Sequence, residues 1–517
     1  MKREKTENKY AISPRAWTTL IVLGLSVLIT MYGETMLLPA IPDIINEFHI
    51  SYNTSSWILT AYLIAGAVMT PIAGKLSDVY GRKKMVLLIL IIYIIGVVIG
   101  GWSPNFYLML VSRITQGIGI SMFPIAFGII RELLSTQKLA IGVGIFTSMF
   151  AAGSVVGLAL GGNIVQHFGW HTTFFSILPL AMTLWFAINR YVKDTIQNSS
   201  VLQNNSQLDN RNNNTQRNNK FTSIIDIKGA ILLTVIITSF LLAITIIGNI
   251  NNNTDTKSLN NGSNTVFYTF LTLIATTIVS VVLFIIVEKK IESPLIDLKL
   301  FGNKIFLISN VLVLTLGLPM FLVYQTIPFL VRSPPPGGFG GSAVEAAMVQ
   351  LPFMIIFLIF APASGFIISK IGSIKPVVFG TIISLVGFSS MFAFHSTETL
   401  VEGNLAVIAV GFALLNTGIF NIIMTSTPIQ YSGISLGMSV VIMIVGMSIG
   451  PIVSGFFMQS FQTTTTASTI MMTSHPSATA YDMIFVTGIS ISVCSVILSL
   501  ILRKKIKQSN TDIIQQA

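Results

Sequence analysis

Two ionisable side chains lie within long apolar stretches of this sequence. Arg113 belongs to the stretch 107–131, and Glu34 belongs to the stretch 17–40. Inside a membrane such a charge costs several kcal/mol unless it faces protein or water, so these residues are functional candidates by default. We expect Glu34 to load and release a proton in a partly dry cavity, and Arg113 to adjust the charge of that cavity. Two plainer interpretations stay open: Arg113 only pairs with a neighbouring carbonyl or carboxylate, and Glu34 is solvated near the outer surface.

Five amide side chains within apolar stretches of the second half of the chain are candidates for a polar role. Each can line a cavity or simply hydrogen-bond across helices, as polar residues in membrane bundles do. Bridging is the simpler interpretation for each, and two of them, Asn416 and Asn421, are retained as candidates for a substrate cavity. The five are Asn310, Gln325, Gln350, Asn416 and Asn421.

A short basic stretch from Gly74 to Lys84 separates two apolar runs. Gly74 and Asp78 are one helical turn apart, so they share a face at the end of a predicted helix. Gly81 then breaks that helix, and Arg82 begins the next one. A single copy of this stretch is explained by a turn that its positive charges hold on the cytoplasmic face of a membrane.

The basic stretch has a second copy 291 residues later. Gly365 and Gly372 stand where the first copy has Gly74 and Gly81, and Lys375 is its closing lysine. The recurrence favours a specific structural role over a turn held only by charge.

A glycine series recurs independently at nearly the same offset, 293 residues. Glycines four residues apart form a smooth stripe that lets helix backbones approach closely. Tight packing explains the stripe, and a rocking contact is its functional interpretation. Two motifs at one offset predict two halves of the same topology, an architecture of transporters whose substrate path lies between the halves. The first copy comprises Gly153, Gly157, Gly161 and Gly162, and the second comprises Gly446, Gly450 and Pro451.

The composition places these motifs in a membrane. Of 517 residues, 52% are hydrophobic and 9% are charged, with a mean hydropathy of +0.78, whereas soluble domains carry about 25% charged residues. Basic residues at membrane edges explain the net charge of +11, so we expect no nucleic-acid partner. One cysteine and five scattered histidines predict neither a disulfide nor a metal site. No nucleotide or catalytic motif appears, so we expect neither an enzyme nor a cofactor.

Fourteen apolar segments of about 20 residues, enough to cross the bilayer core, predict an all-α integral membrane protein with six, two and six spans. We expect an N-terminal six-helix half at 1–190 and a polar, Asn-rich cytoplasmic linker at 191–226, which cannot bury a core. An inserted helix pair at 227–290, a C-terminal six-helix half at 291–503 and a cytoplasmic tail at 504–517 follow.

Lysine and arginine predict the orientation. With the N-terminus inside, 27 of the 30 lysines and arginines lie on the cytoplasmic side, whereas Lys257 and Arg332 lie outside and Arg113 lies within a span. This asymmetry follows the positive-inside rule. An even number of spans then puts both termini in the cytoplasm, and we expect the plasma membrane as the location.

The chain resembles the major facilitator superfamily, and specifically its fourteen-span drug/proton antiporters, from about residue 15 to 503. The stretch from Gly74 to Lys84 is similar to the superfamily's loop 2–3 signature, which implies a gate latch formed by Gly74, Asp78, Gly81, Arg82 and Lys84. The glycine series resembles the span 5 motif of the antiporters, except that Leu158 stands where the family usually has proline.

Two further matches concern proton coupling. Arg113 and Gln116 resemble the span 4 motif, whose arginine is linked to proton coupling in the family. Glu34, eight residues before Pro42, resembles the acid of the tetracycline/proton antiporters. The resemblance implies proton-coupled efflux of hydrophobic or cationic small molecules by alternating access, with no obligatory protein partner. Proton-coupled import or facilitated transport of a metabolite, and a non-transporting membrane sensor, are the alternatives.

Overall fold

The computed structural model describes residues 14–134, 136–192, 227–250, 262–291, 298–427, 432–466 and 472–516. This part of the chain is almost entirely helical, and it contains fourteen helical segments long and apolar enough to cross a membrane. The expected all-α fold with fourteen spans is therefore confirmed. From residue 193 onward, the polar linker predicted at 191–226 lies outside the described residues.

The first six spans contain short helices besides the long ones. Gly81, with φ +97°, separates α4 from α5, a conformation that glycine adopts without strain. The Asn105 side chain accepts a hydrogen bond from the Leu108 backbone N–H and so caps α6. The elements are α1 (Pro14–Thr35), η1 (Leu38–Ala40), α2 (Ile41–Phe48), α3 (Tyr52–Ser55), α4 (Trp57–Tyr80), α5 (Arg82–Gly101), α6 (Phe106–Gly117), η2 (Ile118–Ser121), α7 (Met122–Leu133), α8 (Thr136–Phe168) and α9 (Trp170–Tyr191).

The last six spans repeat this order with longer helices. A capping box between Ser342 and Glu345 starts α15, and Gly372, with φ +78°, ends it. The last helix continues to Gln516, so the predicted tail at 504–517 is helical up to that residue. The elements are η3 (Leu298–Gly302), α14 (Lys304–Arg332), α15 (Ala343–Ile371), α16 (Ile374–Ala393), α17 (Glu398–Ser426), α18 (Ser432–Ser460), β1 (Gln462–Thr466), β2 (Met472–Pro476) and α19 (Ala478–Gln516).

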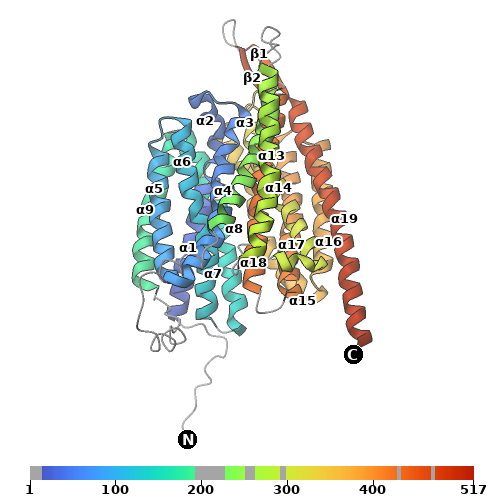
Figure 1. Cartoon of the computed structure of the whole chain (residues 1–517). Coiled ribbons are helices and arrows are strands. Elements are labelled where there is room, and N and C mark those ends of the chain that lie inside the picture. The colour runs from blue at the N-terminus through green and yellow to red at the C-terminus, as the bar shows by residue number, and fades with distance from the viewer. Residues whose placement is uncertain are drawn as a thin grey trace.

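Packing follows the repeat that the sequence predicts. In the first six spans α8 packs on α1 and α5 packs on α9; in the last six, α18 packs on α14 and α16 packs on α19. The two halves then meet along two equivalent seams, α4 against α18 and α8 against α15. Helix α1 begins and α19 ends at one end of the bundle, the proximal end, whereas α2, α3 and the antiparallel β1–β2 hairpin lie at the other, the distal end (Figure 1).

The inserted pair consists of α12 (Ile227–Ile250) and α13 (Gly262–Lys290), which pack on each other. Through α12 the pair also contacts α18 of one half and α3 and α4 of the other. Thr245 of α12 anchors this contact, since its carbonyl accepts from Asn53 Nδ2 and its hydroxyl from Trp57 Nε1. The pair therefore lies across the α4–α18 seam.

Candidate functional site

Arg113 lies in α6 with its side chain fully buried. Its Nε donates to the Ile58 carbonyl at 3.2 Å, and its Nη1 donates to the Gly33 carbonyl at 3.3 Å and to Gln116 Oε1 at 3.0 Å. The guanidinium carbon lies 4.7 Å from the centre of the Tyr62 ring, within cation–π distance. Arg113 thus joins α6 to α1 and α4.

Gln116 extends this network toward α5. Its side chain is fully buried, and its Nε2 donates to the Gly96 carbonyl at 3.2 Å and to Ser112 Oγ at 2.7 Å. Ser112 Oγ in turn donates to the same Gly96 carbonyl at 2.7 Å. Gln116 and Arg113 share a face of α6, because they are one turn apart, and the structure brings these two predicted residues into direct contact.

Glu34 lies at the end of α1, directly after the Gly33 carbonyl that Arg113 binds, and only 4% of its surface is exposed. It is therefore not the solvated surface residue that one interpretation allowed. The carboxyl interacts electrostatically with Arg113 without a direct ion pair, and Arg113 Nη2 has no hydrogen-bond partner among the described residues. Arg113 thus has the carbonyl partners that the plainer interpretation expects, and its role in proton coupling stays a prediction.

A residue of the other half completes the surroundings of Glu34. Tyr324 in α14 lies within electrostatic range of Glu34, and its hydroxyl donates to Met354 Sδ at 3.2 Å. The Tyr324 ring lies 4.9 Å from the Phe321 ring and 5.6 Å from the Phe353 ring. The turn η1 that follows Glu34 contacts α14 and α15. The end of α1 that carries Glu34 therefore lies at the junction of the two halves, within range of an aromatic and thioether surface of the C-terminal half.

The two asparagines predicted for the cavity differ in their positions. Asn416 in α17 is half-buried, and its Oδ1 has no partner among the described residues. Asn421 is exposed and accepts a hydrogen bond from Ser373 Oγ at 2.7 Å, at the turn between α15 and α16. The structure therefore does not bring Asn421 to Glu34 and Arg113.

The glycines of the basic stretch occupy the proximal end of α4. A side chain added at Gly74 meets no atom of the described residues within 4 Å, so among them this surface is open in the observed conformation. Gly81 forms the break between α4 and α5 that the sequence predicts. Asp78 belongs to α4, but its side chain lies outside the described residues.

The basic residues of this stretch turn toward their own half. The Arg82 guanidinium lies over Gly128 of α7, where a Cβ would come within 2.8 Å of Nη1. Lys83 Nζ donates to the Asn189 carbonyl of α9 at 2.9 Å. Lys84 is exposed.

The glycine stripe of α8 packs as its spacing predicts. A Cβ at any of its first three glycines would meet backbone atoms of α1, near Leu28, Tyr32 and Met36 in turn. The fourth glycine faces the other half instead, where a Cβ would lie 2.6 Å from that of Ala347 in α15. The stripe therefore joins helices within one half and, at its distal end, between the halves. Its members are Gly153, Gly157, Gly161 and Gly162.

The second copies of both motifs are placed equivalently. Gly446 and Gly450 of α18 pack on the backbone of α14, at Leu314 and Leu318, and Pro451 is buried beside them. Near the proximal end of α15, a side chain added at Gly365 meets no atom within 4 Å in the part of the chain that the structure describes, as at Gly74. Gly372 ends α15, and Lys375 is exposed in α16.

An ion pair that the sequence analysis did not predict joins the halves at the distal end. Arg332, the last residue of α14, donates to Asp43 of α2 from both terminal nitrogens and to the Pro39 carbonyl. Further contacts between the halves lie at the same end, including Tyr52 N–H to Gln459 Oε1 at 3.1 Å. The usable signal in the sequence was that Arg332 is one of only two lysines or arginines predicted for the outer side of the membrane.

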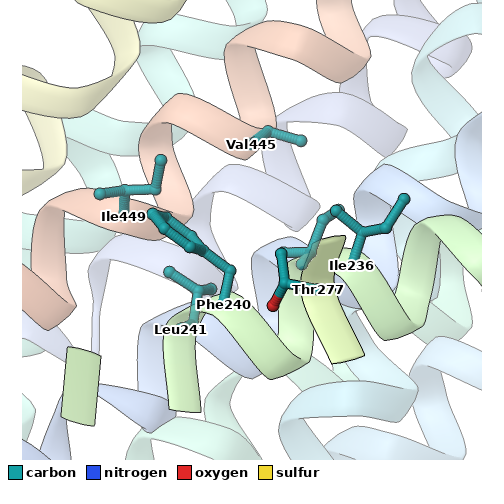
Figure 2. Close-up of a pocket in the computed structure, with 7 residues that line it drawn as sticks. Ile236, Phe240, Leu241, Thr277, Val445 and Ile449 are labelled. Atoms are coloured by element: carbon teal, nitrogen blue, oxygen red, sulfur yellow. The ribbon is translucent and has the colours of Figure 1, made fainter. Parts of the chain in front are cut away.

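A separate apolar cavity of about 250 Å³ lies between the inserted pair and α18. Figure 2 shows the Phe240 ring pointing from α12 toward Ile449 of α18, with Thr277 of α13 nearby. Ile236, Ile237, Leu241 and Val445 complete the lining. The cavity contains neither Glu34 nor Arg113, so it is distinct from the polar site.

Comparison with known proteins agrees with this architecture. Residues 23–451 match the family model of the Major Facilitator Superfamily. The chain belongs to this superfamily. Multidrug resistance protein 3 of Bacillus subtilis is 29% identical over 362 residues, which cover 69% of this chain and 62% of that relative. The tetracenomycin C resistance and export protein of Streptomyces glaucescens is 25% identical over 454 residues, 86% of this chain and 76% of the relative.

Solved structures of superfamily members share the fold. The D-xylose–proton symporter superposes with a TM-score of 0.60 at 12% identity. The match covers 94% of this chain and 97% of the symporter chain. The human organic anion transporter MFSD10 gives a TM-score of 0.59 at 15% identity, and the match covers 94% of this chain and 100% of the MFSD10 chain. At such identities the likeness concerns the fold alone.

Proposed function

We propose that this superfamily member is a secondary transporter that exports hydrophobic or cationic small molecules in exchange for protons. The observation that carries the proposal is the buried Glu34 beside Arg113 at the junction of the two halves. A carboxyl can be charged or neutral, so it can hold either a proton or a cationic substrate, but not both. Competition between the two for one site is sufficient to couple their movements.

The proposal rests on alternating access between the halves. Contacts between the halves gather at the distal end, where Arg332 binds Asp43 and Gly162 packs on Ala347, whereas Gly74 and Gly365 near the proximal end face open space. With the orientation that lysine and arginine predict, this arrangement is an inward-facing state of a plasma-membrane protein with both termini in the cytoplasm. The two halves correspond to 1–190 and 291–503.

The substrate class is supported by the surface opposite Glu34. Tyr324, Phe321, Phe353 and Met354 offer aromatic faces and a polarizable sulfur, which suit apolar and cationic molecules of varied shape. Relatives named for multidrug resistance and for tetracenomycin C export are consistent with this class. We propose no cofactor and no obligatory protein partner.

One departure from the family pattern supports an alternative. Leu158, fully buried in the α8 helix, stands where antiporters usually have proline. Proton-coupled import, or transport without coupling, is therefore the second candidate.

Efflux from proteoliposomes under an imposed pH gradient tests the proposal. Wild type is compared with Glu34→Gln and Arg113→Ala, using a fluorescent hydrophobic cation. Glu402→Gln, on α17, is the matched control for loss of an acid, and the exposed Arg190→Ala is the control for loss of a cation. Gradient-driven transport that wild type and both controls retain, and both site variants lose, supports proton antiport. Equal wild-type transport with and without the gradient contradicts coupling and favours a facilitator.

A further inference from the structure

Gln350 of α15 has an unsatisfied side chain in a buried position. Its exposure is 0%, and neither its Oε1 nor its Nε2 has a hydrogen-bond partner within the described part of the chain. Other buried hydroxyl side chains of α14 and α15 are paired: Thr326 donates to the Leu322 carbonyl at 2.6 Å, and Ser364 to the Phe360 carbonyl at 2.6 Å. Gln350 therefore does not bridge helices, the simpler role that its sequence context suggests.

An unpaired amide at this position is unfavourable for folding. Burial of an amide without compensating hydrogen bonds opposes folding, and most buried polar side chains in proteins have a partner. Methionine has a similar length and shape and would avoid this penalty. The amide is therefore explained more readily by a partner outside the chain than by the stability of the fold.

The neighbours of Gln350 place it at the junction of the halves. Ala347 and Met354 lie on the same face of α15, three residues before it and four after it. Ala347 packs on Gly162 of the other half, and Met354 accepts the hydrogen bond from Tyr324, which lies within electrostatic range of Glu34. Gln350 thus lies between the tight distal contact and the layer of Glu34.

We propose that Gln350 binds a polar group of the transported molecule and selects substrates that carry a paired donor and acceptor, such as a carboxamide. A primary amide side chain offers two donors and an acceptor, and a carboxamide on the substrate complements both. In this scheme Glu34 binds the positive charge of the substrate and the aromatic surface binds its apolar part. Gln350 adds selection between substrates by hydrogen bonding. This inference rests on the proposed export of small molecules through the junction.

Two matched probes separate this role from general effects. Tetraphenylphosphonium has no hydrogen-bonding group, whereas (carbamoylmethyl)triphenylphosphonium replaces one phenyl ring by a short carboxamide arm. Equilibrium binding of both cations to purified wild-type protein and to Gln350→Met is measured in detergent. Two lost hydrogen bonds predict an affinity for the carboxamide probe that is roughly 5- to 150-fold weaker. Affinity for tetraphenylphosphonium remains unchanged.

Two controls accompany this comparison. Gln166→Met makes the same substitution at the α8–α15 seam, where Gln166 Oε1 accepts from the Val344 N–H at 3.2 Å; it should affect both probes equally or not at all. The thermal unfolding temperature of Gln350→Met should equal or exceed that of wild type, because an unpaired amide is removed.

The possible failures are distinguishable. Equal changes for both probes in Gln350→Met, no change for either, or a lowered unfolding temperature overturns the role of Gln350 and leaves the proposed function standing. If wild-type protein binds neither cation, the proposed substrate class is wrong and the inference fails with it.

Discussion

Arg332 and Asp43, 289 positions apart in the chain, form an ion pair with two hydrogen bonds of 2.6 Å each. Arg332 Nη1 also donates to the Pro39 carbonyl at 2.9 Å. The planar guanidinium matches a carboxylate in this two-bond geometry, which lysine cannot reproduce. Because Arg332 ends α14 and Asp43 lies in α2, the pair joins the halves at the distal end. Opening that end requires the pair to break.

Loss of this pair should therefore shift the conformational equilibrium toward a distal-open state. The side chain of Arg332 is 20% exposed and that of Asp43 is 35% exposed. We therefore expect Asp43→Asn to shift the equilibrium between the distal-closed and distal-open states by about 1–2 kcal/mol, roughly 5- to 30-fold. Spin labels at Trp102→Cys and Phe394→Cys, exposed positions at distal turns of the two halves, report the separation by electron paramagnetic resonance in a Cys494→Ser background. The expected result is a larger population at long distance.

The charge swap Asp43→Arg with Arg332→Asp is the control for this experiment, since it restores an ion pair at the same place. It should return the distance distribution toward that of wild type. An Asp43→Asn protein with an unchanged distribution would mean that helix packing alone closes the distal end.

Glu34→Gln should uncouple transport from the pH gradient without preventing substrate movement. Glutamine preserves the size of the side chain and its hydrogen-bonding capacity, but it cannot exchange a proton at any physiological pH. Counterflow of labelled against unlabelled substrate, which needs no net proton movement, should continue in this variant. Uphill transport driven by a pH gradient should fall to the level of protein-free vesicles. Persistence of gradient-driven transport in Glu34→Gln would place the proton elsewhere.

Local chemistry explains which site residues could be predicted from the sequence. Arg113 and Glu34 are evident because a charge within an apolar run has no ordinary explanation. The contact of Arg113 with Gln116 follows from their separation by one helical turn. The break at Gly81 could also be predicted, because a residue with positive φ between two helices is usually glycine.

Relationships between distant residues could not be predicted in this way. Asp43 and Arg332 lie near membrane edges, where a charge is ordinary, and no spacing rule connects α2 with the end of α14. Asn416 and Asn421 looked equivalent in one apolar run, but hydropathy does not show which face of α17 meets other helices, and only Asn421 is exposed. The β1–β2 hairpin forms from a polar stretch between two spans. From the sequence, such a stretch predicts only a loop.

Arg113→Lys should retain the charge and lose the function. Lysine cannot reach the carbonyls of Ile58 and Gly33 together, which lie on different helices and bind separate nitrogens of Arg113. Each buried acceptor left unpaired costs about 1–3 kcal/mol, so the unfolding temperature should fall and transport should be lost. Arg190→Lys, at an exposed position of α9, should change neither quantity. Full transport by Arg113→Lys would show that positive charge alone suffices.

Leucine substitutions at two motif glycines should have different effects on stability. At Gly157 a side chain would meet the backbone of Tyr32 and the hydroxyl of Thr35, so overpacking should destabilise the protein by about 1–3 kcal/mol or more. At Gly365 no atom lies within 4 Å, so leucine should leave the unfolding temperature of the distal-closed state unchanged or slightly higher. Thermal unfolding in detergent measures both.

The transport assay tests whether the surface at Gly365 closes during the transport cycle. If the proximal ends of the halves must approach each other when the distal end opens, a bulky side chain at Gly365 prevents that closure and traps the observed state. We then expect a well-folded protein that binds substrate and does not transport it, with the smaller Gly365→Ala keeping part of the wild-type rate. Normal transport by Gly365→Leu would show that α15 does not close through this surface, and the motif would then serve only to end the helix at Gly372.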